Sequence, residues 1–479
     1  TAFAGATTGQ QLLYALDEQV RRYEVEGRVR RFENHEFVSV VRDESGAARG
    51  IVVMDLRRMK LETFPVQAVA LATGGPGLLF GKTTNSSINT GTAASVAYQQ
   101  GAEYGNGEFI QVHPTSIPGS DKLRLMSESL RGEGGRVWVP KNPGDKRPGQ
   151  DIPDKERWYF LEEKYPVYKN LVPRDIASRE IFDVVVNQGM GVGGERFVYL
   201  DLTHLAPERH HKLEGVLEIY EKFIGQDPRK VPMKVFPAVH YSMGGLWIDY
   251  DQMTNIPGLF AVGEADFAFH GANRLGANSL ISCIYSGIVA GPSMIRYASK
   301  DQKGAVSSVI LDQERRRLEE EFAALKRMDG GENPYRLWAE MGDMMADNCT
   351  VVRDNAKLRE TDQRLSEMLE RWKRCSVLDS GATANQPLMF LRQLRNMLVL
   401  ARVVVGGALL RDESRGAHYK PEFPKRDDEN FMKHTIAAYG GSPEAPPKLS
   451  YRPVDVSLMQ PVLRDYTKVP DYAPASAKI

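Results

Sequence analysis

One arginine stands in a stretch rich in glycine and asparagine, and this composition suits the binding of an anion. The stretch reads HGANRLGANSL at residues 270–280, with His270 at its start and Arg274 near its centre. Glycine lets a backbone approach a ligand closely, and the planar guanidinium group matches a carboxylate or a phosphate. Glycine and asparagine clusters also form ordinary turns, and most arginines lie on solvated surfaces. The stretch alone therefore leaves both an anion site and a plain surface turn open.

Four more stretches carry acidic, basic and histidine side chains of the kind that act in catalytic sites. They read VHPTS at 112–116, MSESLRGEGG at 126–135, VPRDIASRE at 172–180 and VHYSMGG at 239–245. Glu128 and Arg131 are three residues apart, so one helical turn puts them on one face, which also fits a solvated ion pair. Arg174 follows a proline and fits a helix start, and His113 alone fits a structural loop histidine.

Two short apolar runs end in glycine-containing segments, as strands do in nucleotide-binding α/β sheets. The runs are FPVQAVALATGG at 64–75 and IPGLFAVGEAD at 256–266. Ligands of such sheets lie at the carboxyl ends of the strands. Because the two runs are far apart in the chain, we expect one sheet that an inserted domain interrupts. The candidate ligand contacts at these strand ends are Thr73, Gly74, Gly75 and Glu264.

Hydrophobic periodicity predicts the elements that must position these residues. It predicts a helix over 8–24 and two strands joined by a turn over 36–56. The Pro- and Gly-rich loop at 139–154 is predicted to lie on the surface. Further helices are predicted at 312–330, 335–347, 356–375 and 386–404. The predicted domains are a nucleotide-binding domain in two parts (1–107 and 242–310), an inserted domain (108–241), a helical domain (311–410) and an extended C-terminal region (411–479).

Composition excludes several classes of function. The 62 basic and 62 acidic residues give a formal net charge of zero, so nothing favours nucleic acid or another polyanionic partner. A hydrophobic content of 42% and a charged content of 26% are typical of soluble globular proteins. The longest apolar run, MLVLARVVVGGALL, is interrupted by Arg402 and is predicted to be too short for a membrane span.

The cysteines and the first residue indicate where the chain works. The three cysteines, Cys283, Cys349 and Cys375, have no metal-type spacing, so we predict no metal site. Their odd number fits packed thiols in a reducing, cytoplasmic location. The sequence begins at Thr1 without a secretory or transit pattern, and we interpret it as a chain whose beginning is missing.

Read together and in their order, these stretches closely resemble the flavoprotein subunits of succinate dehydrogenase and fumarate reductase. The likeness continues into the tail, which contains ESRGAHYKPEFPKRDDENF. The segments FPAVHYSMGGLW and NLVPRDIASREIFD look most like the menaquinone-linked bacterial succinate dehydrogenases. The resemblance implies an α/β fold with a Rossmann-like FAD-binding domain, incomplete at its amino end. It also implies an inserted α+β capping domain, then a helical domain and an extended C-terminal region.

The resemblance implies a site for a four-carbon dicarboxylate, which needs hydrogen-bond donors at both ends. It assigns His240 and Arg274 to one carboxylate, and His113 and Ser127 to the other. Ser127 stands where many relatives carry threonine, and the exchange keeps the hydroxyl group. His270, beside the arginine loop, is left as a structural residue.

Oxidation of a dicarboxylate also requires the removal of a proton, and the resemblance assigns this step to Arg174. Arginine is an unusual base because its free pKa is about 12 or higher. The resemblance makes Glu128 and Arg131 a relay that carries the proton between Arg174 and solvent. Only such a relay makes an arginine usable as the base.

The resemblance implies FAD as the cofactor. Thr73, Gly74, Gly75 and Glu264 match family positions near it, while Ser279 and Leu280 approach the flavin through their backbone. The GxGxxG segment that receives the pyrophosphate and the histidine that carries FAD covalently belong at the family's amino end, and neither appears in this sequence. Thr92 stands where many relatives have an aspartate near the flavin, and we do not predict it as a flavin ligand.

The predicted activity is the oxidation of succinate to fumarate by hydride transfer to the flavin. By resemblance, the electrons pass to an iron–sulfur subunit and then to a membrane cytochrome b subunit that reduces quinone. The chain is expected at the cytoplasmic face of the cell membrane, held there through its partner subunits. The alternatives are fumarate reductase, L-aspartate oxidase and an inactive fragment without the FAD pyrophosphate site. The phrase HYSMGG and the long tail fit the dehydrogenase better than the oxidase.

Overall fold

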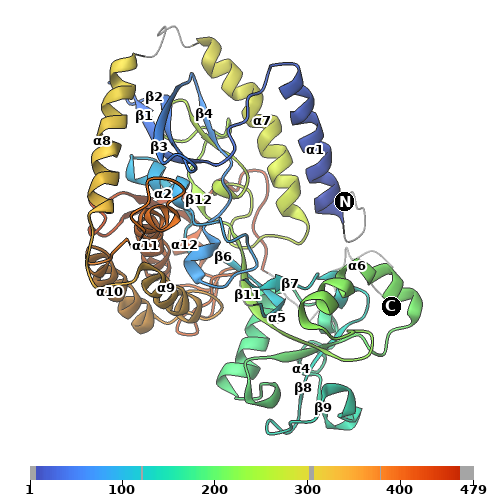
Figure 1. Ribbon diagram of the computed structural model, residues 1–479. Coiled ribbons are helices and arrows are strands. Elements are labelled where there is room, and N and C mark those ends of the chain that lie inside the picture. The colour runs from blue at the N-terminus through green and yellow to red at the C-terminus, as the bar shows by residue number, and fades with distance from the viewer. Residues whose placement is uncertain (1–6, 120–121, 301–306, 378, 464–479) are drawn as a thin grey trace. The chain divides into compact units, whose positions relative to one another are not determined.

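The computed structural model describes residues 7–119, 122–300, 307–377 and 379–463 (Figure 1). The chain forms two compact units. One is built on Val112–Ala238, and the other on Asp17–Gln111 together with Val239–Val454. The first unit therefore interrupts the second in sequence, which is the arrangement that the two distant glycine-ended strands predict.

The Val112–Ala238 unit contains most of a six-stranded sheet with the strand order β7-β6-β11-β10-β8-β9. Strands β6 and β11 run across the two boundaries of this unit. Apolar side chains from the sheet pack with those of the helices into one core, which includes Val137, Leu200 and Leu217. The strands are β6 (Ile110–Ile117), β7 (Arg124–Leu125), β8 (Arg136–Pro140), β9 (Arg157–Trp158), β10 (Val198–Asp201) and β11 (Met233–Ser242). The helices are α3 (Ser129–Gly132), α4 (Phe160–Lys164), α5 (Arg174–Phe182) and α6 (Pro207–Ile224).

The two predicted glycine-ended strands lie side by side in the other unit. Strand β4 (Val69–Leu71) pairs in parallel with β13 (Leu259–Ala261), and the Val262 N–H continues the ladder by donating to the Leu71 carbonyl at 3.0 Å. The two carboxyl ends therefore meet at one edge, as the sequence predicts. A separate antiparallel sheet forms from β1 (His35–Arg42), β2 (Ala48–Asp55) and β3 (Lys60–Pro65). The prediction of two strands within 36–56 is confirmed.

Four helices follow in the region that the sequence predicts to be helical. They are α8 (Ser308–Lys326), α9 (Pro334–Asn348), α10 (Asn355–Trp372) and α11 (Gln386–Leu410). Side chains at all four of their amino ends accept backbone hydrogen bonds, for example Asp354 from the Lys357 N–H at 3.0 Å. Helix α8 packs on the β1–β3 sheet, while α11 contacts α8, α9 and α10. The four predicted helices are confirmed, with ends that differ by a few residues.

Helix α11 contains the apolar run that the sequence analysis considers too short for a membrane span. The helix has 25 residues and is long and apolar enough to cross a membrane, but 72% of its most apolar window is buried inside the protein. Arg402 within it forms an ion pair with Asp362 at 3.0 Å. Its apolar composition is that of a core helix in the bundle, and the helix is longer than the apolar run because it begins at Gln386.

Helices α1 (Thr8–Val25) and α7 (Asn278–Lys300) are much more exposed. The predicted helix over 8–24 is confirmed, but none of its described residues is buried, and Leu13 is 64% exposed. Helix α7 also passes the length and composition test for a membrane span, with 22% of its window buried. Among the described residues, nothing covers the large apolar side chains on its open face, which include Ile288 and Ile295.

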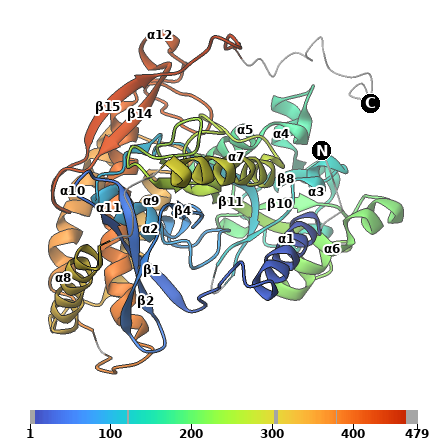
Figure 2. The ribbon, with the colours of Figure 1, turned by 90° about the horizontal axis from the view of Figure 1, so that it is seen from above.

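The C-terminal region is more regular than the extended chain predicted for 411–479. It contains α12 (Asp428–Phe431) and the antiparallel pair β14 (Lys433–Ala438) and β15 (Lys448–Pro453), which Figure 2 shows side by side. Strand β14 also pairs with β5 (Tyr104–Gly105), which in turn pairs with β12 (Gly245–Leu246). These partners are far away in sequence, so local patterns gave no sign of the sheet. Residues 464–479 of the predicted region lie outside the described residues.

Candidate active site

One glutamate joins the two arginines that the sequence analysis groups as a relay. Glu128 Oε2 accepts hydrogen bonds from Arg174 Nε at 3.1 Å and Nη2 at 2.9 Å. Its other oxygen, Oε1, accepts one from Arg131 Nη2 at 3.2 Å. The Glu128 side chain is 40% exposed, whereas the Arg131 side chain is 1% exposed. The three groups thus form a continuous hydrogen-bonded chain that runs from the interior to solvent.

Burial changes the acidity of one member of this chain. The Arg131 guanidinium also donates to the carbonyls of Asn170 at 2.7 Å and Val172 at 3.1 Å, which hold it inside the protein. Burial and the positive charge of Arg174 lower the pKa of Arg131, Glu128 opposes both, and the resulting pKa is about 10. The Arg131 guanidinium therefore releases a proton more readily than an exposed arginine does.

Arg174 is placed by the start of helix α5. Pro173 precedes the helix, and Arg174 is its first residue. Proline before the first turn costs no hydrogen bond, because helix-starting N–H groups have no partner within the helix. The Arg174 side chain is 10% exposed. The helix start that the sequence suggests for this residue is confirmed, and it coexists with the contact to Glu128.

His113 and Ser127 are the other polar candidates in the Val112–Ala238 unit. His113 lies on β6 and is fully buried, and its Nδ1 accepts from the Thr115 N–H at 3.3 Å. An accepting Nδ1 leaves the proton of a neutral imidazole on Nε2, where it can be donated to a carboxylate. Ser127 Oγ lies 3.1 Å from Ser129 Oγ, at the start of the short helix α3. Both residues offer hydrogen-bond donors, as the dicarboxylate assignment requires.

In the second unit, His240 is oriented by a threonine near the first glycine-rich segment. Its Nδ1 is 2.9 Å from Thr84 Oγ1. Thr84 also donates its backbone N–H to the Val239 carbonyl at 3.1 Å, and Thr83 Oγ1 donates to the same carbonyl at 2.8 Å. These contacts fix the imidazole ring on strand β11. The sequence gave no indication of either threonine, because they lie more than 150 positions from His240.

Arg274 is buried in a loop between β13 and α7. Its guanidinium carbon lies 4.7 Å from the centre of the Tyr241 ring, in cation–π geometry, and Tyr241 follows His240 on β11. Gln111 Nε2 donates to the Arg274 carbonyl at 2.6 Å and to Asn273 Oδ1 at 3.1 Å. The residue is 3% exposed, so the reading as a solvated surface arginine does not hold. Tyr241 and Gln111 are contacts that the sequence analysis missed.

His270 has local partners that agree with its assignment as a structural residue. Its Nε2 is 3.2 Å from Ser282 Oγ, and its ring meets Tyr241 edge to face at 5.2 Å. Burial, together with the smaller effect of the Arg274 charge, lowers the pKa of His270 to about 4. The ring is therefore neutral near pH 7 and adds no charge to the arginine loop.

The edge where β4 and β13 end is built so that a planar group can come close. Gly74 has φ of +73°, in the left-handed region that favours glycine. A Cβ on Gly75 would lie 2.6 Å from Glu264 Oε1, so any larger residue there would displace the Glu264 side chain. Thr73 precedes them directly after the strand. The carboxyl end of parallel strands is the cofactor position expected for these residues, and their contact with FAD stays a prediction.

The Glu264 carboxylate accepts hydrogen bonds from protein groups around the two strand ends. Its Oε1 accepts from the Ser242 N–H at 2.9 Å, and Gly75 and Asn85 also donate to its carboxylate. Burial raises the pKa of Glu264 to about 7, and these donors oppose the shift. The carboxylate therefore ties the two strand ends to β11. The contact of Glu264 with FAD stays a prediction.

Ser279 and Leu280 lie in the first turn of α7, which begins at Asn278. Backbone N–H groups in a first turn have no acceptor within the helix and suit a ligand oxygen. Thr92 is buried and its hydroxyl is 2.8 Å from that of Thr90, so the protein itself satisfies it. These positions agree with the choice of backbone contacts at α7 and with the omission of Thr92.

The cysteines differ in their surroundings. Cys349 and Cys375 are buried, and burial raises the pKa of their thiols to about 12 and about 11. Cys283 is exposed on helix α7, so its prediction as a packed thiol is wrong. The error follows from α7 itself, whose apolar sequence is typical of a buried helix.

Two other features of the described residues lie apart from these candidates. A cavity of about 440 Å³ in the Val112–Ala238 unit is lined by Arg147, Tyr199 and Lys234 among others, and no predicted site residue lines it. His35, Asp55 and Glu62 place possible metal-ligand atoms within 4.8 Å of one another, a group that no sequence motif indicated. His35 and Glu62 approach to 3.7 Å, which fits an ion pair when the imidazole is protonated.

Comparison with known proteins finds matches for both the amino-terminal and the carboxy-terminal part of the chain among flavoproteins. Residues 1–280 match the family model for an FAD binding domain, and residues 338–466 match that for the C-terminal part of fumarate reductase flavoproteins. The chain is 59% identical to the succinate dehydrogenase flavoprotein subunit of Bacillus subtilis, over 98% of this chain and 78% of that protein. It is 34% identical to the fumarate reductase flavoprotein subunit of Escherichia coli, over 97% and 76% of the two chains.

Solved structures agree with this assignment. A chain of Escherichia coli quinol fumarate reductase matches with a TM-score of 0.86 and 32% identity, covering 98% of this chain and 78% of that one. Mycobacterium smegmatis Sdh1 in complex with UQ1 matches with a TM-score of 0.75 and 31% identity, over 93% and 71%. The fold, the order of the motifs and these similarities agree, and the chain belongs to the family of succinate dehydrogenase and fumarate reductase flavoproteins.

Proposed function

We propose that this chain is the flavoprotein subunit of a succinate dehydrogenase and oxidises succinate to fumarate with FAD. The observation that carries the proposal is the bridge from Arg174 through Glu128 to Arg131. A buried arginine that shares a half-exposed carboxylate with a second arginine is an arrangement suited to moving a proton. The 59% identity with a succinate dehydrogenase flavoprotein subunit supports the same choice of substrate.

The substrate would be bound by donors at both of its ends. His240 and Arg274 bind one carboxylate, and His113 and Ser127 bind the other. The Arg274 guanidinium supplies a full positive charge from a buried position, where a charge-assisted hydrogen bond is stronger than in water. The lowered pKa of His270 keeps that neighbour neutral, so Arg274 does not compete with a second cation for the substrate.

Oxidation removes a hydride from one central carbon of succinate and a proton from the other, which leaves the double bond of fumarate. FAD, when bound, supplies the acceptor for the hydride and so for both electrons. Thr73, Gly74 and Gly75, with the N–H groups of Ser279 and Leu280, are the residues that would hold the cofactor. Glu264 keeps the strand ends in place for this contact.

The proton goes to Arg174, which must be neutral at that moment. Arg174 can reach this state by passing its own proton to Glu128, to which two of its nitrogens already donate. Glu128 is the most exposed member of the chain and exchanges the proton with solvent. Arg131, with its pKa near 10, stabilises the ionised carboxylate between transfers and stays in place through the two backbone carbonyls.

We further propose that the electrons leave through an iron–sulfur subunit and a membrane cytochrome b subunit that reduces quinone. The chain would then sit at the cytoplasmic face of the cell membrane, bound through these partners. The similarity to Mycobacterium smegmatis Sdh1 in complex with UQ1 supports a link to quinone.

Fumarate reduction is the second candidate, since relatives at 34% identity are fumarate reductase flavoproteins. The same residues serve both directions: Arg174 would deliver the proton that it otherwise removes. Turnover measured with succinate and an electron acceptor, and with fumarate and a reduced dye, compares the two rates directly.

Replacement of Arg174 by lysine tests the proposal. Lysine lacks the fork that can donate twice to Glu128 while facing the substrate, so Arg174→Lys should lower kcat by at least about 100-fold, the usual contribution of an acid–base group. FAD content should stay unchanged. The matched control is Arg179→Lys in the same helix, which should retain activity. Activity of Arg174→Lys within a few-fold of the unchanged protein would remove Arg174 from the chemistry.

A further inference from the structure

The loop that carries Arg274 is held by a turn from the C-terminal region. The Ala417 N–H donates to the Ala272 carbonyl at 2.8 Å. Gly416, just before it, has φ of +57°, and a Cβ at this position would lie 2.3 Å from the same Ala272 oxygen. The close approach therefore requires glycine both for its backbone angle and for its lack of a side chain.

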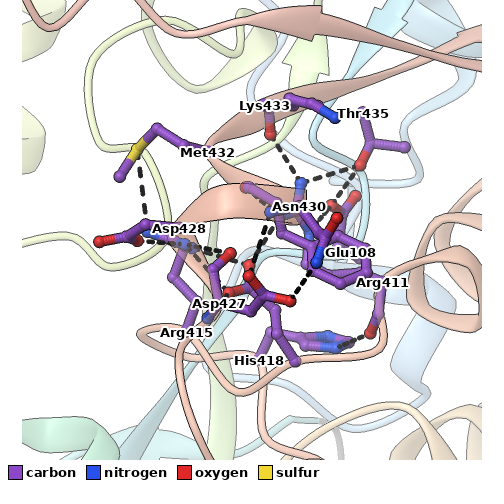
Figure 3. Close-up of polar contacts among 12 residues, drawn as sticks. Glu108, Arg411, Arg415, His418, Asp427, Asp428, Asn430, Met432, Lys433 and Thr435 are labelled. Carbon is purple, nitrogen blue, oxygen red and sulfur yellow. Dashed lines mark hydrogen bonds and ion pairs between the residues drawn. The ribbon is translucent and has the colours of Figure 1, made fainter.

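The turn itself is closed and firmly anchored. The Arg415 N–H donates to the His418 carbonyl at 2.8 Å, and the His418 N–H returns a bond to the Arg415 carbonyl at 3.0 Å. The Arg415 guanidinium donates to Glu413 at 2.7 Å and to Asp428 at 2.7 Å (Figure 3). Arg415 and His418 thus bond to each other at the two ends of the turn, and the Arg415 side chain anchors the turn to Glu413 and Asp428.

Behind the turn lies a buried network of charges. Arg411 donates to Glu108 at 2.7 Å and to Glu413 at 2.8 Å, and all three residues are fully buried. His418 is also fully buried, and its Nε2 is 3.0 Å from the Arg411 carbonyl (Figure 3). Arg353 contacts the Nδ1 of His418. A buried, paired network of this kind resists rearrangement, because breaking any pair leaves a buried charge without its partner.

The opposite side of the loop has its own support. Gln111 holds the Arg274 carbonyl and Asn273, while the turn holds Ala272. Apolar contacts add to this, since Ala272 and Ala417 pack against the buried cluster of Phe109, Tyr241 and Met243. Three consecutive loop residues are therefore fixed from two directions, and the third of them is the arginine.

We propose that the turn Arg415–His418 positions Arg274, with Gly416 as the residue on which the position depends. The C-terminal region thereby sets the affinity for the dicarboxylate, although none of its residues is assigned to the substrate. A bound carboxylate needs its guanidinium partner placed to within about half an ångström, and supporting contacts of this kind provide that accuracy. The inference rests on the proposed function of Arg274.

The test compares Gly416→Ala with Gly193→Ala. Gly193 has a similar positive φ but no residue close to it such as Ala272. Gly193 has φ of +63°, and a Cβ there would meet nothing within 4 Å, so Gly193→Ala carries the same backbone strain alone. Malonate, a dicarboxylate that cannot be dehydrogenated, is titrated into each FAD-loaded protein by calorimetry. Gly416→Ala should raise the dissociation constant at least about tenfold. FAD content and Tm should change no more than in Gly193→Ala.

Arg274→Ala separates the two levels of the argument. If Arg274→Ala leaves malonate binding unchanged, the proposed substrate role of Arg274 fails, and this inference fails with it. If Arg274→Ala weakens binding while Gly416→Ala matches Gly193→Ala, the substrate role stands and the positioning role of the turn is overturned. Should Gly416→Ala not fold, Asp428→Asn decides, because it loosens Arg415 from a half-exposed site. A rise of about threefold or more in the malonate dissociation constant supports the inference, and no rise overturns it.

Discussion

Two guanidinium groups share one carboxylate at the centre of the candidate proton path. The Glu128 group carries one negative charge against the two positive charges of Arg131 and Arg174, so the cluster favours the approach of an anionic substrate. Burial and like charge together lower the pKa of Arg131 to about 10. The lowered pKa of Arg131 suits proton transfer, and the charges of the two arginines suit the binding of an anionic substrate.

A second titrating group near the glycine edge gives a pH prediction. Asp266 is 4% exposed, and burial raises its pKa from 3.8 to about 7. The folded state holds the proton more tightly than the unfolded state, so this contribution to stability is present below about pH 4 and is lost as pH rises toward 7. Between pH 5 and 7.5 the ionisation of Asp266 should cost about 2.5 kcal/mol.

Asp266→Asn removes this ionisation and keeps a polar side chain of the same shape. Between pH 5 and 7.5 the Tm of the variant should therefore fall less than that of the unchanged protein, and the gap should grow steadily over this range. Thermal unfolding in a series of buffers measures it. Parallel Tm curves for the two proteins would mean that Asp266 does not titrate as its burial indicates.

Residue spacing predicts contacts within one turn and fails for contacts made by folding. The pairing of Glu128 with Arg131 follows from a separation of three residues, and the structure shows it. The contacts of Gln111 and Ala417 with the Arg274 loop join segments more than 140 residues apart, and no local pattern signals them. Glu264 illustrates the same limit, since its protein donors Gly75 and Asn85 lie far away in the sequence.

At the level of elements, the parallel pair β4 and β13 creates the edge at which the cofactor is expected. Gly75 packs closely against Glu264 at this edge, because a Cβ on Gly75 would meet the Glu264 side chain. Gly75→Ala should therefore push the strand ends apart and lower FAD content after desalting by about tenfold, the effect of losing one charge-assisted contact.

The control for Gly75→Ala is Gly331→Ala, whose added methyl group meets nothing within 4 Å. The flavin absorbance of the desalted proteins measures their FAD content. Equal flavin content in both variants would mean that the glycine edge does not contact the cofactor.

Elements with a strong periodic pattern were predictable, and those that depend on distant partners were not. Helices α8 to α11 have amphipathic or apolar repeats and side-chain caps, which act locally. Strands β14 and β15 sit in a Pro- and charge-rich region and gain their order from β5, more than 300 residues earlier. Local composition therefore predicted extended chain where the fold makes a sheet.

At the scale of the whole molecule, one compact unit is inserted into the sequence of the other. The insertion is predicted at 108–241, and Val112–Ala238 is the segment of the first compact unit that lies there. The predicted boundaries fall close to strands β6 and β11 because each of these strands continues across a boundary. The candidates for proton transfer are in the inserted unit, whereas those for the cofactor are in the unit that it interrupts. The proposed reaction therefore requires residues from both parts of the chain.

The most direct test of the account is the reduction of bound flavin by succinate. The purified protein is incubated with FAD, desalted under anaerobic conditions and mixed with succinate, malonate or aspartate while the visible flavin absorbance is recorded. The account predicts bleaching by succinate, protection by an excess of malonate, and no bleaching by aspartate. Retained flavin that aspartate bleaches and succinate does not would contradict the account and favour an amino-acid oxidase.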